Sequence, residues 1–407
     1  MSENRLKVLH GLPKQVLYCK RCVMSNQRPS SSPEHLKKDT SIATAAFGED
    51  GVCHACLYSD FKKTKINWDE RERQLRDLLD RHRRRDGNQQ YDCIVPGSGG
   101  KDSIWVSHLL KYKYGMNPLT VTWAPHMYTD VGFRNMQHWI HSGFDNILHS
   151  PNGRVHKTLT RLAFEHLCNP FQPFIMGQKL LMVKIAQRFG IKLIMYGENQ
   201  AEYHNRIEEN QSPLMRPDFY SRSGGDISDL RFGTKTPEQL SEYGIEESDL
   251  IPYIPPQRDE VESSGIEVHY TGYYTKWVPQ EVYYYAVEKA GFEANPAGRS
   301  QGTYSKYASL DDKIDGFNYY TMFIKFCQGR CTSDAAHEIR DGHITRQEAV
   351  ALVRRYDSEF PDLYFQEFLD YIGMSEGRFW EIIDANRSPH LWRKDGDSWV
   401  QRYPLAD

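Results

Sequence analysis

The stretch VPGSGGKDS, residues 95–103, is a glycine-rich loop with one lysine, and it overlaps the end of the apolar run YDCIVP at residues 91–96. A loop of this composition between a strand and a helix is typical of phosphate binding. It fits neither familiar pattern. A Walker A loop needs glycine where Val95 stands and serine or threonine where Asp102 stands, and a Rossmann loop starting at Gly97 needs glycine at Asp102. Asp102 therefore raises the question of which phosphate chemistry this loop serves.

The sequence around the loop alternates short apolar runs with segments of helical periodicity. Such alternation predicts βαβ units and a parallel sheet with right-handed connections, so the predicted fold class is α/β. Ligands of these sheets lie beyond the carboxyl ends of the strands, where we expect the loop, WAP (123–125) and GENQAE (197–202) to meet. The predicted strands are 91–96, 117–125, 144–150, 191–199 and 266–274, and the predicted helices are 67–86, 101–114, 131–143, 154–168, 174–189, 279–291, 310–326, 334–357 (with a helix start at Asp341 or Thr345) and a pair within 361–386.

The loop itself predicts an anion site. Backbone N–H groups at the start of a helix point toward one spot and add positive potential there. The glycines allow a phosphate to approach closely, the serines can donate hydrogen bonds, the lysine adds a charge, and the aspartate can hold Mg²⁺. A plain tight turn is the alternative. The predicted site residues are Gly97, Ser98, Gly99, Gly100, Lys101, Asp102 and Ser103.

The composition excludes several classes of protein. The chain has 407 residues, of which 39% are hydrophobic and 26% charged, and its formal net charge is −3. No apolar run approaches the ~20 residues of a membrane span, and the start MSENRLKVLHGLPKQ lacks the apolar core of a signal peptide. The near-neutral charge argues against a general nucleic-acid binder. We therefore expect a cytoplasmic protein with no membrane contact and no nucleic-acid partner.

Two C-x-x-C pairs stand near the start of the chain. In the cytoplasm, cysteines are expected to be thiols or metal ligands rather than disulfides. Two such pairs can close a tetrahedron with no vacant position, which predicts a structural Zn²⁺. An iron–sulfur cluster and free thiols are the alternatives. The predicted ligands are Cys19, Cys22, Cys53 and Cys56.

The motif SGGKDS (98–103) resembles the pyrophosphate loop of the PP-loop ATP pyrophosphatases, which have the adenine-nucleotide α-hydrolase fold. Members of that superfamily cleave ATP to AMP and pyrophosphate while adenylating a carbonyl-type oxygen. The resemblance implies that Pro96 and residues 97–103 bind ATP and its pyrophosphate, and that Trp123 meets the adenosine. A tryptophan at the end of a strand is equally compatible with a place in the core.

Five further motifs occur before and after the loop in the sequence. Together with the loop, they resemble the N-acetyl sugar amidotransferases of bacterial surface-polysaccharide biosynthesis over about residues 16–390. The resemblance implies an ATP-dependent C–N ligase that converts the acetamido group of a nucleotide-linked sugar into an acetamidino group, for lipopolysaccharide O-antigen or a related glycan. The amide oxygen would be adenylated first, and ammonia would then displace AMP. The motifs are YCKRCVMSNQRPS, GVCHACLYSD, YGENQAEYH, SLDDKIDGFNYY and GRCTSDAAHEIRDGHITRQEAV.

The same resemblance assigns roles to single residues. Lys101, Asp102 and Lys313 are the candidate catalytic residues, with Lys313 as a second cation on the α-phosphate. Two aspartates of DDKIDG would bind metal or orient the substrate, and the GEN motif would contact substrate or nucleotide. A helix cap and a strand-ending turn are the alternatives for these motifs. The remaining candidates are Glu198, Asn199, Asp311 and Asp312 for substrate or nucleotide, and Arg330 for an anion.

The chain shows no glutaminase of its own. Removal of Met1 would expose Ser2 rather than a cysteine, and no cysteine stands in a G-x-C-x-G pattern. Ammonia is mostly ammonium at neutral pH, which is not a nucleophile, so a channelled supply is expected. The family resemblance implies a separate glutaminase subunit with a cyclase-like barrel subunit as partners, besides ATP, Mg²⁺ and the nucleotide-sugar substrate.

The predicted organisation has four parts. Residues 1–66 form the zinc-binding module, and residues 67–205 form the PP-loop domain. Residues 206–265, polar and turn-rich with a short helix near 236–243, form a lid or substrate insertion. Residues 266–407 complete the nucleotide domain and add a mostly helical C-terminal region.

Two other functions remain open. A tRNA-thiolating PP-loop enzyme would use Cys327 and Cys331 to carry sulfur, and the front-end cysteines and the loop are compatible with it. A nucleotide-binding scaffold without turnover is the second alternative. The presence of Lys101, Asp102 and Ser103 argues against such a degenerate site.

Overall fold

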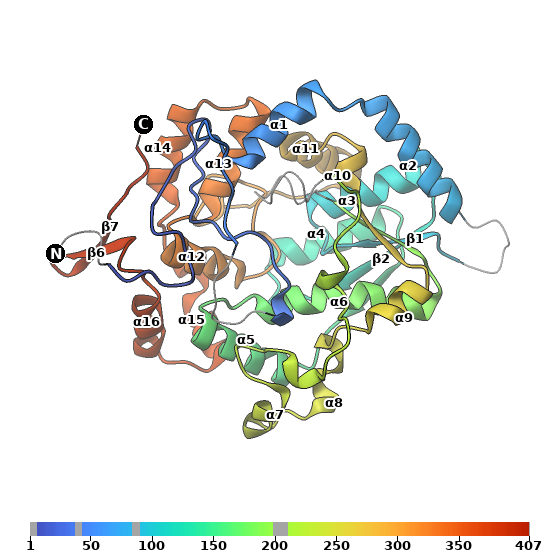
Figure 1. Ribbon diagram of the computed structural model, residues 1–407. Helices are drawn as coiled ribbons and strands as arrows, with labels where there is room; N and C mark the ends of the chain where they lie inside the picture. Colours follow the sequence, from blue (N-terminus) through green and yellow to red (C-terminus); the bar gives the residue numbers. More distant parts are fainter. Residues whose placement is uncertain (1–5, 37–42, 84–89, 198–210, 407) are drawn as a thin grey trace.

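The computed structural model describes residues 6–36, 43–83, 90–197 and 211–406 (Figure 1). Its centre is a five-stranded sheet with the order β3-β2-β1-β4-β5, in which all neighbouring strands are parallel. The fold class is therefore α/β, as predicted. The strands are β1 (Cys93–Pro96), β2 (Pro118–Trp123), β3 (Asn146–His149), β4 (Leu193–Tyr196) and β5 (Glu267–Tyr270).

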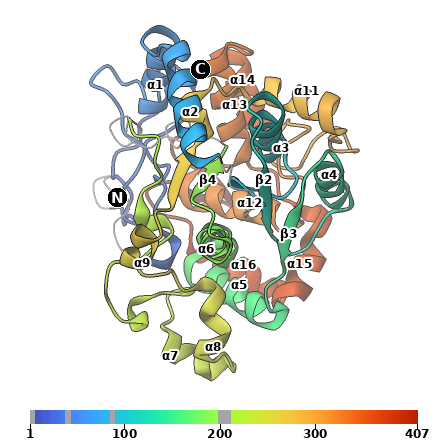
Figure 2. The ribbon, with the colours of Figure 1, turned by 90° about the vertical axis from the view of Figure 1, so that its right-hand side faces the viewer.

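Helices cover both faces of the sheet (Figure 2). Ile94 of β1 and Ile194 of β4 pack with buried residues of α5 and α6, whereas Val95 and Met195 pack with α2, α3, α4 and α11. Side chains alternate between the two faces of a strand, so a strand that is covered on both sides is apolar throughout. These helices are α2 (Trp68–His82), α3 (Lys101–His108), α4 (Asp130–His141), α5 (Gly153–Leu167), α6 (Gln172–Phe189) and α11 (Pro279–Ala290).

Caps determine where several of these helices begin and end. The side chain of Thr129 accepts a hydrogen bond from the N–H of Gly132 at the start of α4, and Gly190 ends α6 in the left-handed region. The end of α3 differs from the prediction, because the α-helix ends at His108 and continues as a wider π-helical turn, Leu109–Lys113. Among the described residues, no helix has both the length and the apolar character that crossing a membrane requires.

The C-terminal region is mostly helical, as predicted, but its boundaries differ in two places. The predicted helix 310–326 begins only at Asp315. The predicted helix 334–357 is two helices, because Gly342 ends the first with φ of 84° and Thr345 starts the second with a capping box. The elements are α12 (Asp315–Phe326), α13 (Arg330–Asp341), α14 (Arg346–Tyr356), α15 (Phe365–Ile372), α16 (Glu376–Ala385) and an unpredicted antiparallel hairpin of β6 (Trp392–Asp395) and β7 (Ser398–Gln401).

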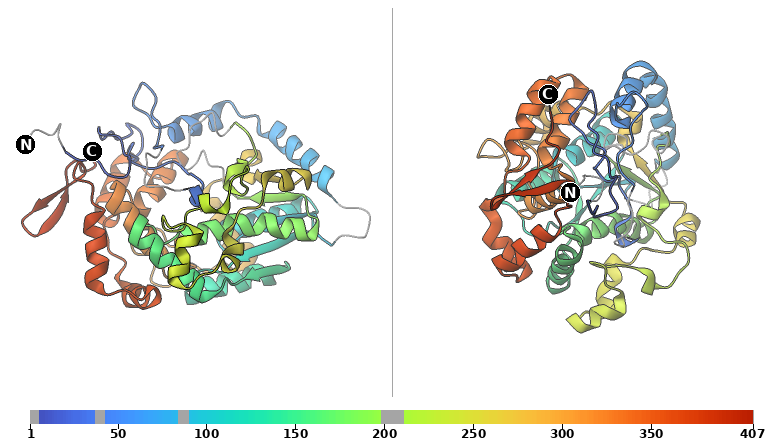
Figure 3. Two further views of the ribbon diagram at one scale, coloured as in Figure 1. Left: turned by 60° about the horizontal axis from the view of Figure 1, so that its bottom comes forward. Right: turned by 60° about the vertical axis from the view of Figure 1, so that its left-hand side comes forward.

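The N-terminal segment, including α1 (His54–Thr64), packs against these C-terminal helices (Figure 3). Its four clustered cysteines share one buried apolar cluster with Ala335 of α13 and Val350 of α14. The backbone N–H of Leu9 donates to the hydroxyl of Ser388 at 2.9 Å. Segments near the two ends of the chain are thus in contact. The division of the chain after residues 66, 205 and 265 stays a prediction.

Residues 211–265 form an excursion between β4 and β5. Its buried Leu240, Leu250 and Tyr253 belong to the same core cluster as α5 and α6. The predicted short helix is confirmed as α7, which continues as a 3-10 turn at Ser241–Tyr243. The sequence after β5, predicted to be strand-like throughout, turns into a short helix after Tyr270. The short helices are α7 (Pro237–Leu240), α8 (Glu247–Leu250), α9 (Arg258–Ser263) and α10 (Thr271–Tyr274).

Candidate functional site

The glycine-rich loop connects the carboxyl end of β1 to the start of α3, with Gly100 as the N-cap. A Cβ at Gly97 would lie 2.2 Å from the Cβ of Ser103. At Gly99, where φ is 89°, a Cβ would lie 2.5 Å from the Cα of Met136. Packing therefore requires both of these glycines. Gly100 is different, because a Cβ there would meet nothing within 4 Å, which leaves open space beside the first N–H groups of the helix.

This open space belongs to a cavity of about 160 Å³. One wall comes from the loop and a second from Gly132 and Asn135 of α4. A third wall comes from residues 307–311 and from Arg330 at the start of α13. The structure thus brings together predicted residues that are far apart in the sequence. Those that line the cavity are Ser98, Gly99, Gly100, Lys101, Asp102, Asp311 and Arg330.

Lys101 and Asp102 form an ion pair, with Nζ 2.6 Å from Oδ2. The other carboxylate oxygen of Asp102 accepts a hydrogen bond from the indole Nε1 of Trp277 at 2.8 Å. The ammonium of Lys101 also lies 5.4 Å from the centre of that indole ring. Trp277 therefore orients both side chains, and sequence reasoning missed it because it lies in no recognisable motif, 175 residues after Asp102.

Asp311 reaches the loop directly. The hydroxyl of Ser98 donates to Oδ2 of Asp311 at 2.5 Å. Burial raises the pKa of this carboxyl. Gly132 permits the approach, because a Cβ there would lie 2.4 Å from the Cα of Asp311. One carboxylate of the DDKIDG motif therefore stands beside the candidate phosphate site.

Asp312 connects the DDKIDG motif to the segment that follows β2 through hydrogen bonds. Its Oδ2 accepts from the backbone N–H of His126 at 2.7 Å and lies 2.7 Å from Nδ1 of the same residue. Its Oδ1 accepts from the N–H of Ile314 at 2.9 Å, and the N–H of Lys313 donates to the carbonyl of Met127 at 2.9 Å. These bonds hold the DDKIDG motif against the chain that follows β2. A contact of Asp312 with metal or substrate stays a prediction.

Lys313 has a different partner from the one its predicted role requires. Its Nζ lies 2.5 Å from a carboxylate oxygen of Glu367 on α15 and 5.2 Å from the ring centre of Tyr364. The hydrogen bond to Glu367 raises the pKa of the amine. Lys313 does not line the cavity at the loop. A contact with the α-phosphate would require Lys313 to leave Glu367, so its catalytic role stays a prediction.

Arg330 lines the cavity and is held in place by two neighbours. Its Nη1 donates to the hydroxyl of Tyr319 at 2.6 Å, and its Nε lies 3.1 Å from Oδ1 of Asp334. Burial raises the pKa of the nearby Asp315 carboxyl to about 7, although the Arg330 charge acts in the opposite direction. A fixed guanidinium at this wall is suited to an anionic ligand.

Trp123 lies in the core rather than at the cavity. It is 2% exposed, and its ring centre lies 4.9 Å from that of His149 and 5.4 Å from that of Tyr253. A Cβ at Gly177 would lie 2.2 Å from the indole, so α6 packs directly on it. Stacking on adenosine would require these neighbours to move, and this contact stays a prediction.

Four predicted residues remain, of which Pro96 and Ser103 belong to the described part of the chain. Pro96 is the buried last residue of β1. The hydroxyl of Ser103 donates to the carbonyl of Gly100 at 2.9 Å and so stabilises the first turn of α3. Glu198 and Asn199 follow β4 and lie outside the described residues.

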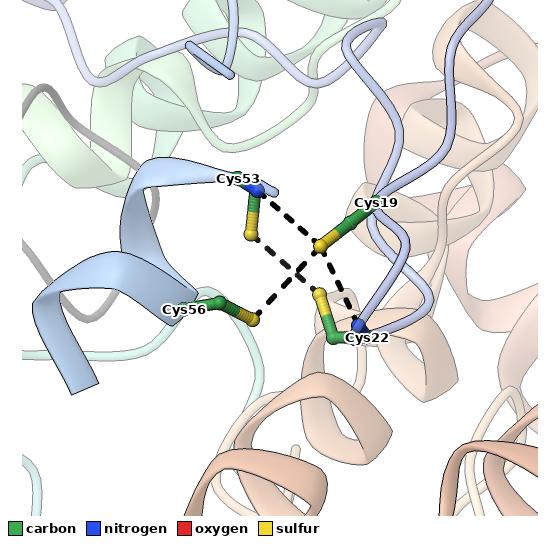
Figure 4. A group of neighbouring side chains, drawn as sticks. All are labelled: Cys19, Cys22, Cys53 and Cys56. Carbon is green, nitrogen blue, oxygen red and sulfur yellow. Dashed lines mark hydrogen bonds between the residues drawn. The ribbon is translucent and has the colours of Figure 1, made fainter. Parts of the chain in front are cut away.

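The four N-terminal cysteines converge on one buried point (Figure 4). Their sulfur atoms all lie within 4.8 Å of one another. The Cys19–Cys56 and Cys22–Cys53 pairs are 4.0 and 3.6 Å apart, close to the ~3.8 Å edge of a tetrahedron with metal–sulfur bonds of about 2.3 Å. The N–H groups of Cys22 and Cys53 donate to the sulfur of Cys19. The predicted four-cysteine cluster is confirmed, its donors fit a closed structural metal site, and zinc as the occupant stays a prediction.

Cys327 and Cys331 lie in a different environment. Cys331 is fully buried on α13, and Cys327 follows α12 in the left-handed region. Burial raises the pKa of both thiols. The thiolate is the reactive form of cysteine, so both residues are mainly unreactive thiols near neutral pH. Their surroundings argue against a role in carrying sulfur.

Comparisons with known proteins extend this description. No curated protein matches the sequence. The solved structures to which this chain is similar include the U34-tRNA thiolase NcsA from Methanococcus maripaludis with its [4Fe-4S] cluster, at 14% identity over 84% of this chain and 87% of that chain, with a TM-score of 0.30. Residues 301–404 match a family model described as LPS biosynthesis protein WbpG-like, C-terminal domain. The segment that supplies Asp311 and Arg330 to the cavity is therefore similar to the C-terminal domain of a family of LPS biosynthesis proteins.

Proposed function

We propose that this chain is an ATP-dependent, AMP- and pyrophosphate-forming amidotransferase. It would convert the N-acetyl group of a nucleotide-linked sugar into an acetamidino group during the biosynthesis of lipopolysaccharide O-antigen or a related surface glycan. One observation carries the proposal. The SGGKDS loop shares a cavity with Asp311 and Arg330, which belong to the segment similar to LPS biosynthesis proteins.

The residues around the cavity support binding of ATP phosphates. The open space at Gly100 beside the start of α3 suits the close approach of a phosphate to backbone N–H groups. Lys101 and Arg330 line the same space and would offset the charge of the departing pyrophosphate. The carboxylates of Asp102 and Asp311 are the groups that would hold Mg²⁺, which supplies further positive charge to the phosphates.

The proposed chemistry has two steps. In the first, the amide oxygen of the sugar attacks the α-phosphorus of ATP, a P–O bond to pyrophosphate breaks, and the amide nitrogen loses its proton. In the second, ammonia attacks the carbon of the resulting imidate, and AMP departs with the former amide oxygen. The net change at the sugar is O to NH. The protein would contribute mainly in-line positioning and stabilisation of charge.

Ammonia would come from partner subunits. The sequence offers no glutaminase nucleophile, so we propose a glutaminase paired with a cyclase-like barrel subunit as the source. The purified chain should use ammonium salts at raised pH, where more of the base is unprotonated, and should not use glutamine. Efficient turnover with glutamine and the purified chain alone would contradict this part of the proposal.

The reaction can be tested with a panel of nucleotide-linked N-acetyl sugars, supplied with ATP, Mg²⁺ and ammonium at raised pH. Replacement of O by NH makes the product sugar lighter than the substrate sugar, and mass spectrometry detects this difference. Pyrophosphate release is measured in the same reactions. Lys101→Met should abolish the conversion in a protein that remains folded. The absence of any mass change across the panel would refute the assignment.

The four-cysteine cluster is proposed to hold Zn²⁺ in a structural role. Its thiolates would occupy all positions of a tetrahedron, so no position is left for substrate. It packs against α13 and α14, and Arg330 is the first residue of α13. The metal would therefore stabilise the element that carries Arg330 rather than take part in the reaction.

A further inference from the structure

A second, larger cavity is lined by the N-terminal segment, α6 and α12, among other elements. The labels of Figure 1 locate α6 and α12 in the fold. The volume of this cavity is about 870 Å³, which falls within the roughly 300–1,000 Å³ of small-molecule sites. The N-terminal segment contributes lining residues from 7–11 and 29–35. Met176 of α6 and Met322 of α12 also line the cavity. None of the loop residues 97–103 lines this cavity, so it is separate from the candidate phosphate site.

The two cavities approach each other at the carboxyl end of β4. Tyr196, the last residue of β4, lines the larger cavity. At the next residue, Gly197, an added Cβ would lie 3.5 Å from the Cβ of Asp102. The chain after β5 joins the same edge, because the N–H of Gly272 donates to the carbonyl of Gly197 at 2.8 Å. Gly197 therefore separates Tyr196, which lines the larger cavity, from Asp102 of the loop.

The charged residues of the larger cavity favour an anion. Among the described residues, its lining contains three lysines, Lys7, Lys179 and Lys325, and one carboxylate, Glu34. Lys325 is only 8% exposed, and its Nζ donates to the carbonyl of Leu167 at 3.0 Å, which fixes the ammonium at the wall. Burial lowers the pKa of His35 to about 4, so this lining residue is neutral near pH 7.

Aromatic rings stand next to these lysines. The ammonium of Lys179 lies 4.2 Å from the ring centre of Tyr196, and the ring of Tyr270 is 6.5 Å from that of Tyr196. Phe219 and Phe326 also line the cavity. Aromatic faces beside cationic side chains are suited to a ligand that joins a flat ring to phosphate groups.

We propose that the larger cavity binds the acceptor, a sugar carried on a nucleoside diphosphate. Lys179 and Lys325 hold the diphosphate, the aromatic side chains contact the base, and the acetamido group points toward the loop at the carboxyl end of β4. This inference rests on the proposed function and adds the place where the acceptor binds. The candidate phosphate site alone does not indicate it, because the two cavities have different linings.

The test uses Lys179→Met and Lys325→Met in the full chain, with Lys157→Met on the exposed side of α5 as the matched control. Affinity for each nucleotide-linked N-acetyl sugar of the panel, and for the free nucleoside diphosphates, is measured by calorimetry. Loss of one charged contact should weaken binding of sugar nucleotide and nucleoside diphosphate about tenfold to a hundredfold. Both variants should bind ATP as tightly as wild type does. The control variant should bind ATP, sugar nucleotides and nucleoside diphosphates with wild-type affinity.

Met322→Trp gives an independent test, because the larger side chain fills part of the cavity without changing its charge. The result of this test remains informative even if Lys325→Met fails to fold. It should also weaken binding of the sugar nucleotide while ATP binding persists. If wild type converts a sugar and all three variants keep its KM, the cavity assignment is wrong and the proposed function stands. If wild type neither binds nor converts any member of the panel, both are overturned.

Discussion

Gly99→Ala and Gly100→Ala add the same methyl group to adjacent residues, yet the two variants should fail differently. At Gly99, φ is 89° and the new Cβ would lie 2.5 Å from the Cα of Met136. The left-handed conformation costs about 1–2 kcal/mol for a residue with a Cβ. Overpacking against backbone costs about 1–3 kcal/mol more. Gly99→Ala should therefore lower the free energy of unfolding by about 2–5 kcal/mol, a large part of the about 5–15 kcal/mol of a typical domain.

Gly100→Ala should leave stability intact. Gly100 has φ of −68°, and a Cβ there would meet nothing within 4 Å. The loss of freedom in the unfolded chain can even stabilise such a variant by about 0.4–1 kcal/mol. The methyl would, however, occupy the space that a phosphate needs. We expect ATP affinity to fall at least about tenfold, which corresponds to about 1.4 kcal/mol.

Urea unfolding without nucleotide measures the first effect, and calorimetric titration with ATP together with pyrophosphate release measures the second. Gly100→Ala serves as the control for the stability measurement, since it adds the same methyl group to the adjacent residue without the clash. A Gly100→Ala protein that binds ATP as tightly as wild type would refute the placement of phosphate beside Gly100. Unchanged stability of Gly99→Ala would refute the packing argument.

Further predictions concern protons, metal and sulfur. Burial raises the pKa of Asp315 from 3.8 to about 7, so the folded chain retains a proton that the unfolded chain releases, and stability should fall as pH rises from about 4 to about 7. Asp315→Asn should flatten this slope in urea titrations, and an unchanged slope would contradict the cause given. Metal analysis should find zinc in a colourless protein, and Cys22→Ser should lower Tm; a brown protein would point to an iron–sulfur cluster. Cys327→Ala and Cys331→Ala should leave pyrophosphate release at the wild-type level, and its loss in folded variants would favour sulfur transfer.

The sequence predicted those features that depend on local pattern. Alternation of apolar strands and amphipathic helices was sufficient for the parallel sheet, because strands covered on both faces are apolar throughout. The spacing of the C-x-x-C pairs was sufficient for the cysteine cluster, because each pair already holds two sulfurs close together. Asp311 and Arg330 were identified by motif, and both line the cavity with the loop.

Features that depend on packing between distant segments could not be predicted. Trp277 orients Asp102 only because the chain after β5 returns to the loop, and nothing in its neighbouring sequence marks it. The ion pair of Lys313 with Glu367 depends on where α15 packs. The larger cavity is lined by the N-terminal segment, by parts of α5, α6, α12 and α16 and by the ends of β4 and β5, so no single stretch of sequence indicates it.

The hydrogen bond between Ser98 and Asp311 joins residues that are 213 positions apart. During synthesis, all five strands of the parallel sheet are therefore made before Asp311 and Arg330, which line the candidate phosphate site. Until residues 307–311 and Arg330 have been made, the cavity has only two of its three walls. A chain that stops before Arg330 would lack this guanidinium at the cavity, so we expect it to bind ATP more weakly than a chain that includes Arg330.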